Sequence, residues 1–441
     1  MIKAQVKLWN SPIGAVLWDP SAQLGFFEYE PAFVESGIQV APIHMPLSPR
    51  IYSFPGLARD TYHGLPGLLA DVLPDRFGNA LINAWLAGQG RNPESFNPVE
   101  RLCYTGRRAM GALEFEPAES PFTPNEAPLD LPALIDLASL VLSDREHFSA
   151  RLSAGDDSRA MADILRVGTS AGGARAKAVV AWNEETGEMR SGQLDLLPGF
   201  THWLIKFDGI SENRDKELAD PKGYGRIEYA YSLMAKAAGI QMSECRLLEE
   251  NGRAHFITRR FDRSDSGEKL HQQSLCALAH LDFNQAGAHS YEQAIALMRQ
   301  LHLPHSSLEE QFRRAAFNIV ARNQDDHTKN IAFLMDKAGH WHLSPAFDMV
   351  FAFNPTGAWT SCHQMSLQGK TENFTRNDFK TLGQLLPLKR GHALAILDEV
   401  LDAVHHWPHF ANQAGVPEST AQEIAKHHRI RALAPSFSQT D

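Results

Sequence analysis

The order of secondary structure along the chain most constrains its fold, because strands are expected first and helices later. Alternating residues around Val6 and Leu8, and the short apolar runs that follow, predict strands over the first thirty residues. Apolar residues recur every three or four positions after about residue 290, which is the period of helices. We therefore predict an α+β fold with two lobes, a small β-rich N-terminal lobe and a larger helical C-terminal lobe.

A proline-rich segment divides the first part of the chain. Five prolines lie between residues 116 and 132, which excludes a regular helix there and indicates a linker. The length of 441 residues fits two or three domains. We expect a β-rich subdomain with some helices at 1–120, the core of the small lobe at 121–262 and a helical lobe at 263–441.

Composition and charge exclude several classes of protein. Acidic residues outnumber basic ones by 52 to 42, so the chain is a poor candidate for direct nucleic-acid binding. The basic segment 425–433 is interpreted as the solvent-exposed face of a terminal helix. The four cysteines lie far apart and predict neither a disulfide framework nor a zinc site. With no signal peptide and no apolar run of membrane-spanning length, we expect a cytoplasmic protein.

A glycine-rich segment at residues 167–182 precedes a β-type run. Small residues beside a strand allow backbone N–H groups to approach phosphates closely. The spacing differs from that of a Walker A motif, and the segment by itself is more typical of a flexible surface loop. The residues of interest are Gly168, Thr169, Ser170, Ala171, Gly172, Gly173, Arg175 and Lys177.

One lysine lies in an otherwise apolar run. Lys206 is surrounded by tryptophan, leucine, isoleucine and phenylalanine in THWLIKFDG. A lysine in such a strand must extend its ammonium group to water or pair with an anion, for which a nucleotide phosphate is suitable. The alternative is a lysine on the wet face of an edge strand.

The sharpest motif is a polar loop between an expected helix and an expected strand. Asp325 precedes Asn330 by five residues, which is the D-x-x-x-x-N spacing of protein-kinase catalytic loops. In that loop the aspartate accepts the proton of the substrate hydroxyl and the asparagine holds Mg²⁺. His327 and Lys329 lie in the same six residues. The alternative is an ordinary polar loop, in which these residue types are common.

A second aspartate and a helical glutamate complete the pattern. Asp348 follows in a strand-like apolar setting, where a metal ion would offset its charge, although a turn aspartate is the alternative. Glu228 lies in a predicted helix between the lysine strand and the polar loop. The order of glycine loop, lysine, glutamate, D-x-x-x-x-N and aspartate is the order that a kinase requires, and it favours a phosphotransferase.

These motifs together resemble the HipA family, bacterial toxin serine/threonine kinases with a kinase-like fold, over nearly the whole chain. GLLADVLPDRFGN looks like the family's N-terminal-lobe signature. SAGGARAK resembles its phosphate loop, THWLIKF its ATP-lysine strand and RRFDR the hinge beside adenine. DDHTKN and SPAFD are similar to its catalytic and metal loops. The resemblance implies an ATP- and Mg²⁺-dependent protein kinase.

The resemblance also implies roles for single residues. It implies that Asp325 is the catalytic base, that His327 and Lys329 lie near the transferring phosphate, and that Asn330 and Asp348 hold Mg²⁺. The residues implied in ATP binding are Ser170, Ala171, Gly172, Gly173, Lys177, Lys206, Arg259 and Phe261, with Arg260 in the same hinge. Ser170, with Thr169 as second choice, falls where the family carries an autophosphorylated serine. Phosphorylation there ejects the loop and silences the enzyme in that family.

The chain departs from the family's familiar catalytic loop at one position. Asp326 stands next to Asp325, where a glycine is more familiar. The second carboxylate either raises the pKa of its neighbour or faces water. We assign the catalytic role to Asp325 because it has the required spacing to Asn330.

The resemblance implies partners that the residues themselves do not indicate. These are a small DNA-binding antitoxin of the HipB type and a translation-related protein substrate, for which an aminoacyl-tRNA synthetase is the example. Two other functions stay open: a small-molecule phosphotransferase, and an ATP-binding pseudokinase in a DNA-bound repressor complex. Any DNA contact is expected to come through a partner.

Overall fold

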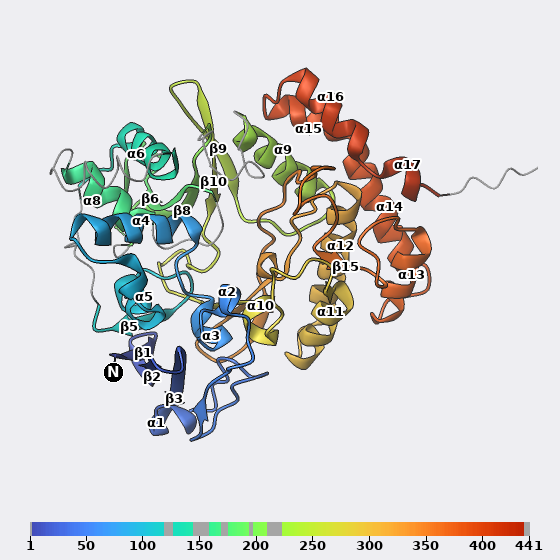
Figure 1. Cartoon of the computed structure of the whole chain (residues 1–441). Coiled ribbons are helices and arrows are strands. Elements are labelled where there is room, and N and C mark those ends of the chain that lie inside the picture. The colour runs from blue at the N-terminus through green and yellow to red at the C-terminus, as the bar shows by residue number, and fades with distance from the viewer. Residues whose placement is uncertain are drawn as a thin grey trace, which may run out of the picture. The chain divides into compact units, whose positions relative to one another are not determined.

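The computed structural model describes residues 2–118, 127–143, 158–168, 175–193, 197–209 and 223–435, and it divides into two compact units (Figure 1). The first unit comprises Met1–Lys222, Arg246–Gln273 and Leu334–His340. The second comprises Gly223–Cys245, Ser274–Phe333 and Trp341–Asp441. The finer division at residues 120 and 262 stays a prediction.

The first unit begins with an antiparallel sheet in the order β4-β3-β2-β1-β5. Trp9 and Asn10 join the first two strands and both have positive φ, as a two-residue hairpin turn between twisted strands requires. The strands are β1 (Ile2–Leu8), β2 (Ser11–Asp19), β3 (Leu24–Tyr29), β4 (Ile51–Tyr52) and β5 (Leu113–Glu116). The strands expected over the first thirty residues are therefore confirmed.

A second sheet of the first unit carries three of the residues expected to bind ATP, Lys177, Lys206 and Arg259. Its order is β7-β6-β8-β10-β9. The strands are β6 (Lys177–Trp182), β7 (Met189–Ser191), β8 (Thr201–Lys206), β9 (Cys245–Glu250) and β10 (Arg253–Arg259). The runs RAKAVVAW and THWLIKFDG, expected to be strands, thus form neighbouring strands of one sheet.

Helices of the first unit pack against this second sheet. Figure 1 shows α4 (Arg76–Gly88), α6 (Leu131–Ser143) and α8 (Ser158–Val167) beside β6 and β8. Phe77 of α4, Ile135 of α6 and Trp203 of β8 belong to one buried apolar cluster. A helix from the first 120 residues therefore shares its core with the lysine-bearing sheet. The other α-helices among residues 2–118 are α1 (Pro31–Val34), α2 (Arg59–Tyr62), α3 (Gly67–Ala70) and α5 (Pro98–Thr105).

The second unit is mainly helical, and its long helix α12 (His305–Val320) leads directly into the polar loop of interest. Helix α14 (His392–His405) packs against α12, and α15 (Trp407–Gln413) packs against α9 (Tyr224–Ala237). The remaining helices are α10 (Leu275–Ala279), α11 (Tyr291–Gln300), α13 (Arg376–Gln384), α16 (Glu418–His427) and α17 (Ile430–Leu433). The expected predominance of helices after residue 290 is confirmed.

Short strands accompany these helices. They are β11 (His271–Ser274), β12 (His289–Ser290), β13 (Ala332–Met335), β14 (Trp341–Leu343) and β15 (Met365–Ser366). β13 begins just after the polar loop, so the predicted helix–loop–strand order is observed. Within the described ranges, no helix combines the length and apolar character needed to cross a membrane.

The basic segment near the end of the chain differs from its sequence interpretation. α16 ends at His427, and the next two residues, His428 and Arg429, are only 9% exposed. The Nε2 atom of His428 lies 3.0 Å from the hydroxyl of Tyr231, which donates to the carbonyl of Ala321. The interpretation as a solvent-exposed face is therefore wrong at these two residues, because the chain turns inward there and anchors beneath the end of α12.

Candidate active site

The polar loop of the second unit closes on itself. The side-chain amide of Asn330 donates to the backbone carbonyl of Asp325 at 2.8 Å. The Thr328 hydroxyl donates to the carbonyl of Leu281 at 2.8 Å and attaches the middle of the loop to the chain after α10. The two residues of the D-x-x-x-x-N motif thus lie at the two ends of one tight turn, as the sequence spacing predicted.

Asp325 presents its carboxylate outward. The Trp359 indole Nε1 donates to Oδ1 at 2.6 Å, and His327 Nε2 lies 3.6 Å from the same oxygen. The side chain nevertheless remains 40% exposed. One carboxylate oxygen is therefore held in place while the carboxylate stays accessible from outside the loop.

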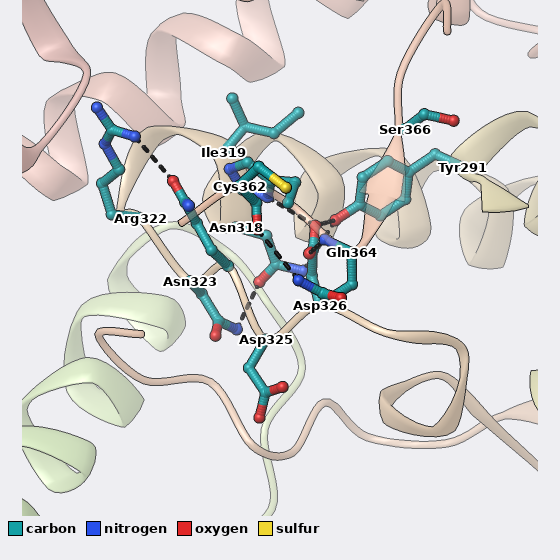
Figure 2. A network of polar contacts seen from close by, with 12 residues as sticks. Tyr291, Asn318, Ile319, Arg322, Asn323, Asp325, Asp326, Cys362, Gln364 and Ser366 are labelled. Atoms are coloured by element: carbon teal, nitrogen blue, oxygen red, sulfur yellow. Dashed lines mark hydrogen bonds and ion pairs between the residues drawn. The ribbon is translucent and has the colours of Figure 1, made fainter. Parts of the chain in front are cut away.

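Asp326 points the opposite way, into the protein. Its side chain has no exposed surface. Oδ2 accepts hydrogen bonds from the Tyr291 hydroxyl at 2.6 Å and from His363 Nδ1 at 2.7 Å, and Oδ1 accepts one from the backbone N–H of Gln364 at 2.8 Å. Figure 2 shows Asp325 directed away from this enclosure. Of the two alternatives for Asp326, the one in which its carboxylate faces water is therefore wrong.

The protonation states of the buried pair Asp326 and His363 follow from the groups that surround them. Burial tends to raise the pKa of Asp326, but His363 and the other donors outweigh it and hold the pKa of this carboxyl below its usual range. Burial lowers the pKa of His363 despite the adjacent carboxylate. Arg429 Nη1 lies 2.7 Å from His363 Nε2, and a guanidinium can only donate, so Nε2 accepts. We assign His363 as neutral with its proton on Nδ1, facing an ionised Asp326.

Asp348 lies in an irregular segment tied to the loop. Asn323 Nδ2 donates to the carbonyl of Asp348 at 3.2 Å, and the Gln324 N–H donates to the carbonyl of Ala352 at 3.0 Å. Asp348 itself has φ of 53°, an unusual conformation for a residue other than glycine. The expected strand-like setting is wrong, since β14 ends at Leu343. The parallel course of the two segments nevertheless holds Asp348 beside the loop.

The other two residues expected to be catalytic lie against aromatic rings. The His327 ring lies 5.2 Å from that of Phe283 and 6.2 Å from that of Trp359, between ring centres. Lys329 Nζ lies 4.8 Å from the centre of the Phe283 ring. The structure thus gathers Asp325, His327 and Lys329 around two aromatic side chains.

The donor set fits a hard cation that relies on a bound substrate. Asn330 and Asp348 offer an amide oxygen and a carboxylate, the ligand types that Mg²⁺ prefers. In the part of the chain that the structure describes, no group of three His, Cys, Asp or Glu side chains could hold a metal by itself. Mg²⁺ sites in kinases use one or two protein ligands and complete the shell with water and phosphate oxygens, so the residues present fit the ion.

The first unit brings together the two lysines expected to bind ATP. Lys177 of β6 lies directly opposite Lys206 of β8 in the antiparallel pair. Lys177 is buried, with Nζ 3.6 Å from Oδ2 of Asp75, the N-cap of α4, and Lys206 Nζ lies 5.6 Å from the centre of the Phe256 ring. Like charges opposite each other on a sheet repel, and the Asp75 carboxylate offsets part of this charge at Lys177.

The expected hinge contains a buried ionic cluster. Arg260 donates from Nε and Nη2 to the two oxygens of Asp262, at 2.9 and 2.7 Å, and is buried. Arg259 instead pairs with the exposed Asp265 at 2.8 Å. Phe261, which follows Arg260 in the sequence, is half-buried. Arg260 therefore has a structural role, and the adenine contacts expected of Arg259 and Phe261 stay predictions.

Part of the expected site lies outside the described residues. This applies to Thr169, Ser170, Ala171, Gly172 and Gly173. Gly168 directly follows α8, and an added Cβ there would come within 2.7 Å of Leu81.

The glutamate singled out in the sequence, Glu228, is buried in α9 of the second unit.

Sequence reasoning missed the residues that support the loop. They are Tyr291, Trp359, His363, Gln364 and Arg429. All five lie 34 to 66 residues away from their partners in the sequence and carry no motif. The basic character of segment 425–433 was a signal for Arg429, but it indicated a surface position. A charged residue that pairs in the interior cannot be told from a solvated one by its sequence alone.

The sheet with paired lysines and the helical unit with its Asp–Asn loop define a kinase-like fold class, and comparison with family models gives the family. The HipA-like C-terminal domain matches residues 169–433 and the HipA N-terminal domain matches residues 4–116. The chain belongs to the HipA family. The family expected from the sequence motifs is thus confirmed.

Known proteins place this membership in context. The solved HipA of Shewanella oneidensis MR-1, in a complex with HipB and operator DNA, has a TM-score of 0.67 and 16% identity, covering 98% of this chain and 96% of that one. This likeness confirms the predicted two-lobed, kinase-like α+β fold class.

Two curated relatives carry kinase names. A Sinorhizobium fredii protein named "Putative kinase Y4mE" is 24% identical over 219 residues, which cover 46% of this chain and 50% of the relative. A Haemophilus influenzae protein named "Putative kinase" is 27% identical over 161 residues, which cover 33% of this chain and 47% of the relative. The chain spans about half the length of these curated relatives.

Proposed function

We propose that this chain is an ATP-dependent serine/threonine protein kinase that acts as a HipA-like toxin. The observation that carries the proposal is the geometry of Asp325. Its carboxylate is exposed, one oxygen is fixed by Trp359, and Asn330 bonds back to its carbonyl. A general base needs this combination of fixed direction and access.

The chain's own residues divide the work of phosphoryl transfer. Asp325 accepts or orients the proton of the substrate hydroxyl, and Lys177 and Lys206 bind phosphate oxygens. Asn330 and Asp348 hold Mg²⁺, which when bound neutralises charge on the phosphates. His327 and Lys329 stabilise negative charge near the transferring group. The HipA-like C-terminal domain match at residues 169–433 includes Lys177, Lys206 and the Asp325–Asn330 loop, and this supports placing them in one reaction.

The proposal includes self-silencing through the glycine-rich segment. A phosphate on Ser170, or on Thr169 as second choice, adds up to about two negative charges close to residues that bind the phosphates of ATP. Repulsion between these charges and ATP is sufficient to prevent binding. The modified protein would then be inactive until the phosphate is removed.

The proposed partners follow from the family. We infer a small DNA-binding antitoxin of the HipB type, supported by the HipA–HipB–operator DNA complex of the structural neighbour. The net charge of −10 supports DNA contact through this partner and not through the chain itself. We propose a protein substrate involved in translation, such as an aminoacyl-tRNA synthetase, and a cytoplasmic location.

The test is intact and peptide mass spectrometry after incubation with Mg²⁺ and ATP. We expect a gain of one phosphate, about 80 Da, on the peptide that contains Ser170 and Thr169. Fragmentation assigns the modified residue. If ATP raises the melting temperature but neither the chain nor an added protein gains phosphate, the kinase proposal fails and an ATP-binding pseudokinase is favoured. Phosphate transfer to sugars or aminoglycosides alone would instead support a small-molecule phosphotransferase.

Removing one cation of the lysine pair should weaken nucleotide binding. We expect Lys206→Met to raise the Kd for ATP by about 10- to 100-fold, because a charge-assisted hydrogen bond is lost. Isothermal titration calorimetry measures this directly. Lys236→Met is the matched control, since Lys236 is an exposed lysine in the last turn of α9. Equal ATP affinity of the two variants would contradict the assigned role of Lys206.

A further inference from the structure

A continuous chain of hydrogen bonds runs from the end of α16 to the candidate loop. Arg429 Nη1 donates to His363 Nε2 at 2.7 Å, and His363 Nδ1 donates to Asp326 Oδ2 at 2.7 Å. Neither His363 nor Asp326 has any exposed side-chain surface. Each group in the series has one possible direction of donation, because the guanidinium can only donate and the carboxylate can only accept.

Arg429 is itself fixed at several points of α12 and the loop. Its Nη1 donates to the carbonyl of Ile319 at 2.8 Å and its Nη2 to Gln324 Oε1 at 3.1 Å. Its backbone N–H donates to the carbonyl of Val320 at 2.9 Å. The guanidinium therefore holds the last turn of α12, the start of the loop and the His363 ring in one arrangement.

The same network reaches the segment that carries Asp348. Tyr291 donates to Asp326 and accepts from Asn318 Nδ2 at 3.2 Å, and Asn318 Oδ1 accepts from Asn323 at 2.9 Å. Asn323 then donates to the carbonyl of Asp348 at 3.2 Å. Figure 2 shows Tyr291, Asn318 and Asn323 around Asp326. One buried carboxylate thus connects the segment of the candidate base with that of the candidate metal ligand.

We propose that Asp326, oriented by His363 and Arg429, is the positioning residue that sets the direction of Asp325. This inference rests on the proposed kinase function and deepens it by assigning the control of its base. Asp326 touches neither nucleotide nor substrate in this scheme and acts through the peptide that it shares with Asp325.

The physical reason is the coupling between adjacent residues of a tight loop. The two side chains leave the backbone in opposite directions, so fixing the Asp326 carboxylate at three donors also fixes the rotation of the Asp325–Asp326 peptide. The Trp359 indole N–H then donates to Asp325 Oδ1 in a single orientation of that carboxylate. If Asp326 loses a donor, the peptide can rotate, and a misplacement of about 1 Å can lower a rate by about 10²-fold.

Two replacements of His363 separate this role from simple core packing. In His363→Asn the amide nitrogen takes the place of Nδ1 and can still donate to Asp326. In His363→Gln the longer side chain reaches toward Arg429 and leaves Asp326 without this donor. We expect His363→Gln and Asp326→Asn to lower kcat by about 10²-fold with little change in the KM for ATP, and His363→Asn to retain at least about a tenth of kcat.

A spectroscopic readout tests the geometry without relying on activity. In protein labelled with ¹⁵N-tryptophan, the Trp359 indole N–H signal reports its hydrogen bond to Asp325 and is assigned with Trp359→Phe. We expect this signal to shift in His363→Gln and Asp326→Asn and to stay in place in His363→Asn. His428→Gln is the control, because His428 is also buried and directly precedes Arg429 in the chain, but bonds to Tyr231.

The outcomes separate the two proposals. A Trp359 signal and a kcat that are unchanged in His363→Gln would overturn the positioning role. Equal losses in His363→Asn, His363→Gln and His428→Gln would do the same, because they would indicate general destabilisation. If the wild type transfers no phosphate at all, the proposed function fails. The positioning role then stands if the Trp359 signal follows the expected pattern and falls if it does not.

Discussion

Replacing Asp325 by asparagine should lower the rate of phosphoryl transfer by about 10³-fold without unfolding the chain. The asparagine oxygen can still accept the hydrogen bond from Trp359 Nε1, and the backbone carbonyl can still accept the bond from Asn330. The outward-facing group becomes an NH₂ group, which cannot accept a proton. The loss is therefore expected in kcat, with ATP affinity retained.

The measurement is the initial rate of phosphate incorporation from labelled ATP, with ATP affinity measured separately by calorimetry. Asp402→Asn serves as the matched control, because it removes an exposed carboxylate from α14. We expect the control to keep the wild-type rate. A rate for Asp325→Asn within threefold of wild type would remove Asp325 from the role of base and with it the main support for the proposed mechanism.

Short-range patterns in the sequence predicted the elements of the site but only part of its arrangement. The five-residue spacing from Asp325 to Asn330 predicted a closed loop, and the hydrogen bond between them confirms it. The register of β6 and β8 pairs two lysines that the sequence had treated separately. Local spacing and strand period determine the loop and the single strands, so these can be read from the chain itself, whereas the register that pairs the two lysines cannot.

The orientation of Asp326 could not be predicted in this way. Its donors come from α11, from residues 363 and 364, and indirectly from Arg429 near the end of the chain. Whether a carboxylate faces water or the interior depends on such distant partners, because burial is costly only when the charge is left unpaired. The interpretation of the basic segment 425–433 was wrong at His428 and Arg429 for the same reason.

Removing the carboxylate of Asp262 should lower the stability of the first unit by about 3–5 kcal/mol. Asp262 is fully buried and binds Arg260 through two hydrogen bonds and Arg263 through one at 2.8 Å. It also accepts the backbone N–H of Gly111 at 2.7 Å, which ties the segment before β5 to the segment after β10. Asp262→Ala leaves two buried guanidinium groups without this carboxylate.

The same segment supplies a control residue, Asp265, whose carboxylate is exposed where that of Asp262 is buried. Asp265 pairs with Arg259 at 2.8 Å, but its side chain is 94% exposed. Asp265→Ala should therefore cost no more than about 1 kcal/mol. Hydrogen exchange of the β10 amides measures both effects, because a chain of two units need not unfold in one step. Equal protection in both variants would mean that the buried cluster does not stabilise this region.

The contribution of Asp262 should also depend on pH in a defined direction. Burial tends to raise the pKa of Asp262, but Arg260 and Arg263 outweigh it and hold the pKa far below its usual range. A carboxyl whose pKa is lower in the folded state stabilises the fold above its unfolded pKa of about 3.9, and this contribution is lost as the pH falls below that value. We therefore expect the difference in β10 protection between wild type and Asp262→Asn to be constant from pH 8 to about 5 and to shrink below about 4. A difference that grows on acidification would show that the ionised carboxylate is not the stabilising form.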